Sequence, residues 1–250
     1  MSLEFLCPDR ALAANGSTPV ARSPIDTLLR DAGARFEIRE GWSVATRFTD
    51  PASEEAACRR TVGIGDRSWL GKLELQAPAS TLAELLAAAC GGLALELGKA
   101  AAADAAWWCP LSAERVLVLC KPGAARALRE RLERAVTGRE TAGVVDVSTG
   151  FAAFAVVGPR ARDVLARLTA LDLRPARAPV GAFRPGSVAR TAAMVLRERP
   201  DSFLVLCGSA YAHYAWTVLW DAAQPLDGTL VGAIALERVE AAGELEAADA

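Results

Sequence analysis

The sequence predicts an α+β protein built as two ferredoxin-like subdomains, with antiparallel sheets and helices packed on them. The first observation behind this is a repeated unit: an apolar segment of strand length, then a turn, then apolar residues at helical spacing. The unit occurs four times, with strand segments at residues 73–75, 116–120, 151–157 and 203–207. The second is that further short strand-like segments stand between the copies, an order that favours antiparallel pairing.

The unit at residues 144–168 is the clearest copy. Residues 151–157 form a bounded apolar segment, and Gly158-Pro159 follows as a turn. Proline suits the first helical position, because its fixed φ fits a helix and its missing N–H would have no partner there. From residue 160 the spacing is helical, with one apolar face made of Val164, Leu165 and Leu168.

The remaining elements follow from apolar spacing and turn residues. The expected helices cover residues 25–32, 53–60, 82–90, 124–136 and about 209–222. Ser53 is the expected cap of its helix, and Thr81 with Glu84 fits a capping box. The additional strands are expected at residues 35–40, 44–48, 105–109, 180–183 and 188–196. We expect residues 105–109 to form a hairpin with 116–120, and a turn at residues 184–186 to join the last two strands.

These elements predict four parts of the chain. Residues 1–22 are expected to be a flexible arm, 23–140 the first subdomain, 141–243 the second subdomain and 244–250 a tail. At 250 residues, two small domains of ordinary size fit.

Composition limits the function classes. Apolar residues make up 52% of the chain and the formal net charge is -2, with basic residues scattered, which argues against a nucleic-acid partner. The six cysteines show neither a CxxC pair nor zinc spacing, so we expect buried free thiols in a reducing compartment and no metal site. No signal peptide and no apolar run of membrane-spanning length is evident, which predicts a cytoplasmic protein without a membrane partner.

Three places could carry chemistry or binding. The single histidine, His213, falls on one helical stripe with Trp216 and Trp220, which favours packing against a sheet over catalysis. In the pair Trp107-Trp108, strand alternation places one ring in the core and the other outside, where it could stack on a planar ligand. The polar turn at residues 66–72 is either a binding loop or a plain surface turn.

The order of several short motifs resembles a known family. Gly41-Trp42, Glu54-Glu55 and the segment DRSWLGK at residues 66–72 are similar to the N-terminal region of the glycine-cleavage T-protein (aminomethyltransferase) family. Asp146-Val147-Ser148 with Val157-Gly158-Pro159 looks still more like the gamma subunit of heterotetrameric sarcosine oxidase, a shortened member of the same superfamily. The resemblance covers about residues 23–243 and implies a link to tetrahydrofolate one-carbon chemistry.

The departures from the transferase pattern bear on catalysis. The acidic hairpin that positions the folate in the transferase has only a partial match at residues 91–96, with Glu96 or Asp104 as substitutes. A glutamate expected near the last strand is missing from residues 199–202, and the chain ends where a third domain is expected to begin. Arg238 and Glu240 do match the transferase.

The resemblance implies two functions. The first is a non-catalytic sarcosine oxidase gamma-like subunit or scaffold, with flavoprotein oxidase subunits or a second copy of the chain as partners. The alternative is a stand-alone tetrahydrofolate-dependent aminomethyl or methyl transferase, or a relative that reuses the folate cleft for another small molecule. Catalytic residues are not identified, and the candidate cofactor-binding residues are Asp66, Ser68, Trp69, Trp108, Arg238 and Glu240.

Overall fold

The computed structural model describes residues 19–90, 93 and 95–248. Most of the expected N-terminal arm, the Gly91-Gly92 pair and the last two residues lie outside this range. Within the described residues the fold is α+β, with mainly antiparallel sheets and helices packed on them, as the sequence predicts. All four strand-then-helix units are present.

The larger sheet has six strands among the described residues, in the order β11-β12-β13-β10-β4-β14. Their bounds are β11 (Phe183–Val188), β12 (Thr191–Arg199), β13 (Ser202–Gly208), β10 (Phe151–Val157), β4 (Gly63–Asp66) and β14 (Thr229–Leu230). Only the short β14–β4 pair is parallel. Because β4 comes from the first half of the chain, the expected boundary at residue 140 does not separate the two sheets.

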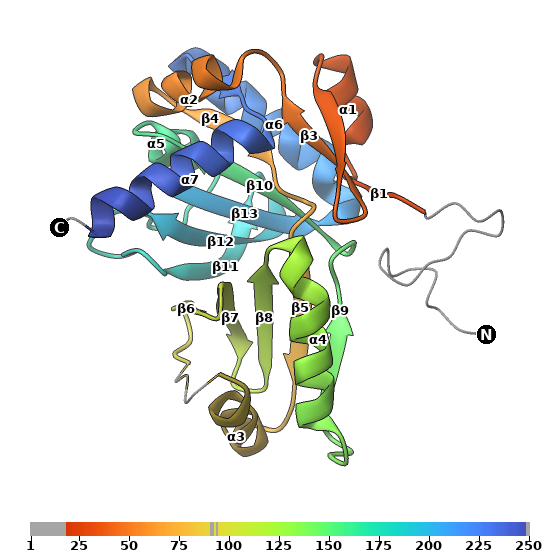
Figure 1. Cartoon of the computed structure of the whole chain (residues 1–250). Helices are drawn as coiled ribbons and strands as arrows, with labels where there is room; N and C mark the ends of the chain where they lie inside the picture. The colour runs from red at the N-terminus through yellow and green to blue at the C-terminus, as the bar shows by residue number, and fades with distance from the viewer. Residues whose placement is uncertain (1–18, 91–92, 94, 249–250) are drawn as a thin grey trace.

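The smaller sheet is antiparallel and contiguous in sequence. In the described part of the chain its five strands run in the order β6-β7-β8-β5-β9. Their bounds are β6 (Ala101–Ala103), β7 (Ala106–Ser112), β8 (Arg115–Cys120), β5 (Gly71–Gln76) and β9 (Gly143–Asp146). The hairpin of β7 and β8 confirms the pairing expected from the sequence. Helices α3 (Ala79–Cys90) and α4 (Pro122–Val136) pack on this sheet, with α4 in front of it in Figure 1.

The other helices lie with the larger sheet (Figure 1). They are α1 (Asp26–Asp31), α2 (Pro51–Arg60), α5 (Ala161–Ala166), α6 (Ala212–Ala223) and α7 (Ala233–Ala248), with short 3-10 turns at Ser209–Tyr211 and Gln224–Leu226. A small third sheet is formed by β1 (Ala21–Arg22), β3 (Trp42–Arg47) and β2 (Arg35–Arg39). Two ends of the chain therefore differ from expectation: residues 21–22 pair with β3, and residues 244–248 continue α7.

Strand alternation explains how the two sheets pack face to face. In β8, Val116 and Val118 join the core under α3 and α4, whereas Leu117 and Leu119 point to the opposite face. The larger sheet has the same pattern, since Leu204 and Leu206 of β13 pack against the smaller sheet. Successive side chains of a strand point to opposite faces, so both strands need a continuous apolar run.

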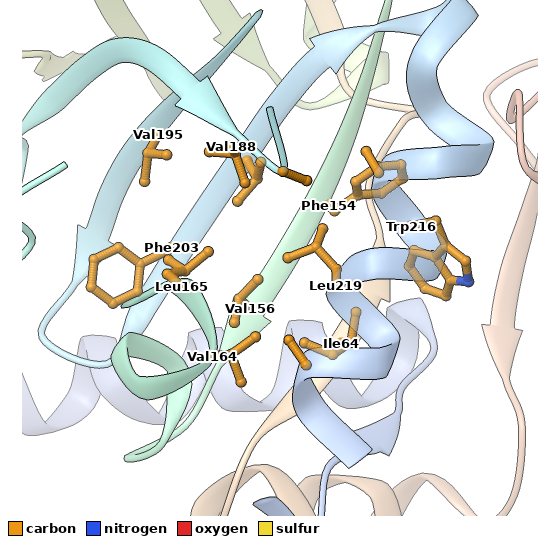
Figure 2. Packing of buried hydrophobic residues seen from close by; sticks show 14 of the residues in the cluster. Ile64, Phe154, Val156, Val164, Leu165, Val188, Val195, Phe203, Trp216 and Leu219 are labelled. Carbon is orange, nitrogen blue, oxygen red and sulfur yellow. The ribbon is translucent and has the colours of Figure 1, made fainter. Parts of the chain in front are cut away.

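The largest core lies between the other face of the six-stranded sheet and helices α1, α5 and α6 (Figure 2). Phe154 of β10 and Trp216 of α6 pack edge to face, with ring centroids 5.4 Å apart. This geometry is favourable for aromatic rings. His213 of the same helix is exposed, so its expected packing against the sheet is wrong. Of the three residues on the expected stripe, only Trp216 and the partly buried Trp220 pack against the core.

The predicted positions of a hairpin turn and of a helix cap are also wrong. The β11–β12 hairpin turns at Ala189-Arg190, whose φ values of 51° and 62° fit the tight two-residue hairpin turn, and not at residues 184–186. Pro185 lies within β11, which the sheet tolerates because β11 is an edge strand. Asp50 caps α2 by accepting the Ser53 N–H at 3.1 Å, so Ser53 lies inside the helix.

The four cysteines whose side chains are described are free and buried, as expected: Cys58, Cys109, Cys120 and Cys207. None of the described helices combines the length and the apolar character needed to cross a membrane.

Candidate functional site

The candidate site begins at the turn that carries the chain from β4 in the larger sheet to β5 in the smaller one. Asp66 ends β4, and its carboxylate accepts hydrogen bonds from the Ser68 N–H at 3.1 Å and from the Ser68 hydroxyl at 2.6 Å. The Ser68 Oγ in turn accepts the Ala153 N–H at 3.1 Å. Asp66 and Ser68 are both buried, and burial raises the pKa of Asp66 against the opposing effect of these hydrogen bonds.

Arg67 leaves the same turn on the other side and forms two ion pairs. Its Nη1 lies 2.6 Å from a carboxylate oxygen of Glu198 on β12, and its Nη2 lies 3.2 Å from a carboxylate oxygen of Glu240 on α7. The side chains of Arg67 and Glu198 are only 11% and 10% exposed, whereas that of Glu240 is 29% exposed. One guanidinium therefore joins the larger sheet to the C-terminal helix.

The two carboxylates keep this guanidinium charged. Burial acts to lower the pKa of Arg67, but Glu198 and Glu240 raise it above its ordinary value. Burial raises the pKa of Glu198, and Arg67 opposes that shift. A buried pair of this kind is costly to break, because removal of one partner leaves the other charge unpaired and out of water.

An inner cleft of about 450 Å³ opens beside these ion pairs. Its walls come from β6, β7, β8 and β12, with Arg67 and Glu240 on one side. Trp107, Leu70 and Leu119 give it apolar surface. Its polar lining residues are Arg67, Cys120, Lys121, Glu198, Arg199, Ser202 and Glu240.

A second cleft of about 590 Å³, which we call the outer cleft, also has Arg67 in its lining. It runs between the β2–β3 turn, the start of α4 and helix α7, and it includes Ile38, Trp69 and Leu236. Arg67, Leu70, Lys121 and Glu240 line both clefts. Arg67 and its partner Glu240 therefore border both spaces, whereas Glu198 borders the inner cleft.

The structure distributes the residues expected to bind a cofactor over different places. Glu240 lines both clefts and Trp69 lines the outer one. Asp66 and Ser68 are buried in the crossover turn. Trp108 is fully buried in the core, where its Nε1 donates to the Ala103 carbonyl oxygen at 3.2 Å, and Arg238 is exposed on α7.

Trp107 takes the place in the cleft that we expected for Trp108. Strand alternation predicts this contrast between the two rings, one in the core and one outside, and in the structure Trp108 is the buried ring while Trp107 lines the cleft. Of the expected acidic substitutes, Asp104 pairs with Arg131 at 2.8 Å, and neither Asp104 nor Glu96 lines a cleft described above.

Sequence reasoning missed Arg67, Glu198 and Lys121. Glu198 stands one residue before the segment in which an acidic residue was judged missing, at the end of the apolar run of β12. A charged residue that interrupts a buried strand near its end was the available signal. The sequence contains no comparable indication for Arg67, because an arginine in a polar turn is typical of an exposed surface.

The charges of the inner cleft favour binding over proton transfer. Three cations, Arg67, Lys121 and Arg199, accompany two carboxylates, and both carboxylates are paired with Arg67. Burial raises the pKa of the Cys120 thiol to about 11, so it stays protonated near neutral pH. Within the described residues, no group of three or more histidine, cysteine or acidic side chains could hold a metal ion.

Comparison with known proteins identifies similar sequences. Residues 25–249 match the profile described as the GCVT N-terminal domain. An aminomethyltransferase from Saccharopolyspora erythraea is 28% identical over 213 residues, which are 80% of this chain and 57% of that protein. One from Streptomyces avermitilis is 28% identical over 216 residues, with the same coverage. The chain thus spans somewhat more than half the length of these relatives.

Two solved structures share the fold. The glycine cleavage system aminomethyltransferase T from Bartonella henselae superposes with a TM-score of 0.73 at 19% identity, covering 86% of this chain and 60% of that one. A chain of the heterotetrameric sarcosine oxidase from Corynebacterium sp. U-96 superposes with a TM-score of 0.64 at 24% identity, covering 82% of this chain and 96% of that one.

Proposed function

The chain belongs to the GCVT N-terminal domain family, and from this premise we propose that it is a ligand-binding subunit without chemistry of its own. In this proposal it acts as a sarcosine oxidase gamma-like subunit or scaffold linked to folate one-carbon metabolism. Flavoprotein oxidase subunits are its proposed partners, and tetrahydrofolate is its proposed ligand.

The observation that carries the proposal is the double ion pair of Arg67. A general acid or base needs a group that can exchange a proton with the substrate at the working pH. Both carboxylates that line the inner cleft face a guanidinium, at 2.6 and 3.2 Å, and Asp66 is buried behind the turn. The described acidic residues of the cleft are therefore suited to hold Arg67 in place and poorly suited to transfer protons.

The lining of the inner cleft supports a planar ligand with an anionic end. Ligand pockets are mostly apolar, with a few placed polar groups. Trp107 offers an aromatic surface, while Lys121 and Arg199 supply positive charge. Tetrahydrofolate has a pterin ring system whose pyrimidine half is planar and a glutamate tail, so its two ends fit these two kinds of surface.

Isothermal titration with tetrahydrofolate under anaerobic conditions tests the ligand. We expect saturable one-to-one binding by the wild type and at least a tenfold weaker affinity for Trp107→Ala, because this substitution removes the aromatic wall. Tyr214→Ala is the matched control, since Tyr214 is an exposed aromatic residue on α6. Absence of saturable heat, or equal affinities for the two variants, contradicts binding in this cleft.

A stand-alone aminomethyl or methyl transferase is the second candidate, favoured by the aminomethyltransferases that are 28% identical to the chain. The two candidates differ in turnover. A subunit is expected to bind flavoprotein oxidase chains and to show no one-carbon transfer when purified alone. Turnover of a folate substrate by the purified chain, lost in Glu240→Gln but not in Glu55→Gln, would establish the transferase instead.

A further inference from the structure

The chain passes between the two sheets at two places, and both begin with the same three-residue pattern. Residues 67–70 connect β4 to β5, and residues 147–150 connect β9 to β10. Asp66 accepts the Ser68 N–H at 3.1 Å, and Asp146 accepts the Ser148 N–H at 2.9 Å. Each aspartate thus fixes the serine two residues later in a tight turn.

Each serine then reaches across to the strand that follows the other connection. The Ser68 Oγ accepts the Ala153 N–H at 3.1 Å, and the Ser148 Oγ accepts the Lys72 N–H at 2.9 Å. The two crossovers therefore form a reciprocal pair. The two residues whose N–H groups donate to these serines are Lys72 and Ala153, and of the two only Lys72 carries a charged side chain.

Lys72 uses that side chain to join the two crossovers. It is fully buried, and its Nζ donates to the carbonyl oxygens of Ser68 at 2.8 Å, Leu70 at 2.9 Å and Ser148 at 3.1 Å. An ammonium group has three donors, so all three are satisfied. Two of the acceptors belong to the connection that carries Arg67, and the third belongs to the other connection.

We infer that Lys72 is a positioning residue for the two clefts, because its ammonium fixes the turn from which Arg67 and Leu70 reach them. This inference rests on the proposed ligand-binding function. The Arg67 N–H also donates to the Ala153 carbonyl oxygen at 2.8 Å, so the backbone of the turn is held from both sides. Loss of the ammonium leaves three carbonyl oxygens without their donor and frees the turn to move Arg67 away from Glu198.

The charges around Lys72 support the same role. Burial lowers the pKa of Lys72 to about 8, and Arg67 acts in the same direction. Asp66 and Asp146 oppose that shift. A neutral amine has two N–H groups for three carbonyl oxygens, so one of the three oxygens loses its donor when Lys72 is deprotonated, and the charged form is the one that satisfies all three.

The chain has three lysines, so one of the others can serve as a control for the replacement of Lys72. Lys72→Met removes the ammonium and keeps an apolar stem of similar length, whereas Lys99→Met is the control, because Lys99 is exposed and lines neither cleft. We expect Lys72→Met to weaken tetrahydrofolate binding at least tenfold. We also expect amide hydrogen exchange at Arg67 and Ala153 to accelerate at least tenfold, with the central amides of β13 unchanged.

A purely structural role gives a different result. If exchange accelerates equally in β13 and in the turn, and the affinity loss equals the loss of folded protein, Lys72 only stabilises the fold and the inference is overturned. Affinity and exchange within twofold of the Lys99→Met control overturn it as well. If the wild type does not bind tetrahydrofolate, the proposed function fails, while the exchange comparison still decides the positioning role.

The wild type alone provides a second test, which holds even if Lys72→Met does not fold. Between pH 7 and 9.5 we expect the protection factors of Arg67 and Ala153 to rise about tenfold, because opening of the turn returns the pKa of Lys72 toward its ordinary value and loss of the proton therefore disfavours that opening. The ¹³C resonance of the Lys72 Cε, one of three lysine signals, should titrate over the same range. Constant protection at the turn while Lys72 loses its proton contradicts the inference.

Discussion

Glu54 on α2 holds three backbone segments together, and its replacement by glutamine should destabilise the protein strongly. The buried carboxylate accepts the Phe48 N–H at 2.7 Å and the Thr49 N–H at 2.6 Å on one oxygen, and the Gly232 N–H at 2.8 Å on the other. In Glu54→Gln the amide oxygen can serve the first two donors, but the amide NH₂ then faces the Gly232 N–H. A lost hydrogen bond to a charged group costs about 1.5–3 kcal/mol and an unsatisfied buried donor about 1–3 kcal/mol, so we expect a total of about 3 kcal/mol.

Urea denaturation followed by circular dichroism measures this loss, as a lower midpoint at an unchanged slope. The matched control is Glu55→Gln on the same helix, where the carboxylate is partly exposed and pairs with Arg59 at 3.1 Å. Such a pair contributes about 0.5 kcal/mol or less. Equal midpoints for the two variants would refute the assignment of Glu54 as the link between α2 and the start of α7.

Three further results are expected. Gly158→Ala should cost about 3 kcal/mol or more, because φ is +124° and the new Cβ would lie 2.3 Å from a backbone carbonyl oxygen, whereas Gly143→Ala, with open space around it, should lie within about 1 kcal/mol of wild type in the same urea assay. Arg67→Met should destabilise by about 3–5 kcal/mol by leaving a buried carboxylate unpaired, and the added change Glu198→Gln should recover part of the loss; a purely additive double variant would contradict the pairing. The folded-state pKa of Lys72 lies near 8, below the ordinary 10.5, so the unfolded chain binds more protons than the folded one between these two pH values. The free energy of unfolding of wild type relative to Lys72→Met should therefore rise by about 3 kcal/mol from pH 8 to 10.5. A difference that does not change with pH would contradict the lowered pKa.

Apolar runs bounded by turns predicted the fold well. The strand at residues 151–157 agrees with β10 at both ends, and the two fully apolar runs of β8 and β13 were located correctly. These strands are buried on both faces, so nearly all of their residues are apolar and their sequences contain no pattern that predicts a turn or an exposed helix. The β4 strand, Gly63–Asp66, was missed because two of its four residues are glycines, which are typical of turns.

The glycines of β4 have a reason that only the tertiary structure supplies. A Cβ on Gly63 would lie 2.3 Å from the sulfur of Cys58, and one on Gly65 would lie 2.8 Å from the Val231 carbonyl oxygen. The strand is glycine-rich because other parts of the chain approach its backbone closely. Local patterns carry no information about such neighbours.

The candidate site was harder to predict than the fold for a similar reason. Asp66 and Ser68 look like exposed functional residues in the sequence, but their short side chains bind the turn's own backbone and the strand across from it. Arg67, between them, reaches partners 131 and 173 residues away, at Glu198 and Glu240. The sequence pattern alone cannot show which of the three consecutive polar residues, Asp66, Arg67 or Ser68, extends to distant partners.

The position of the smaller sheet within the chain sets an order of folding events. Its strands all lie between Gly71 and Asp146, so this sheet can form from local contacts while the larger one is still incomplete. The β4–β10 pair of the larger sheet must instead join residues that come before and after this segment in the sequence. Because closing long loops is slow, we expect the smaller sheet to gain hydrogen-exchange protection first during refolding, and its formation to bring β4 and β10 into each other's reach.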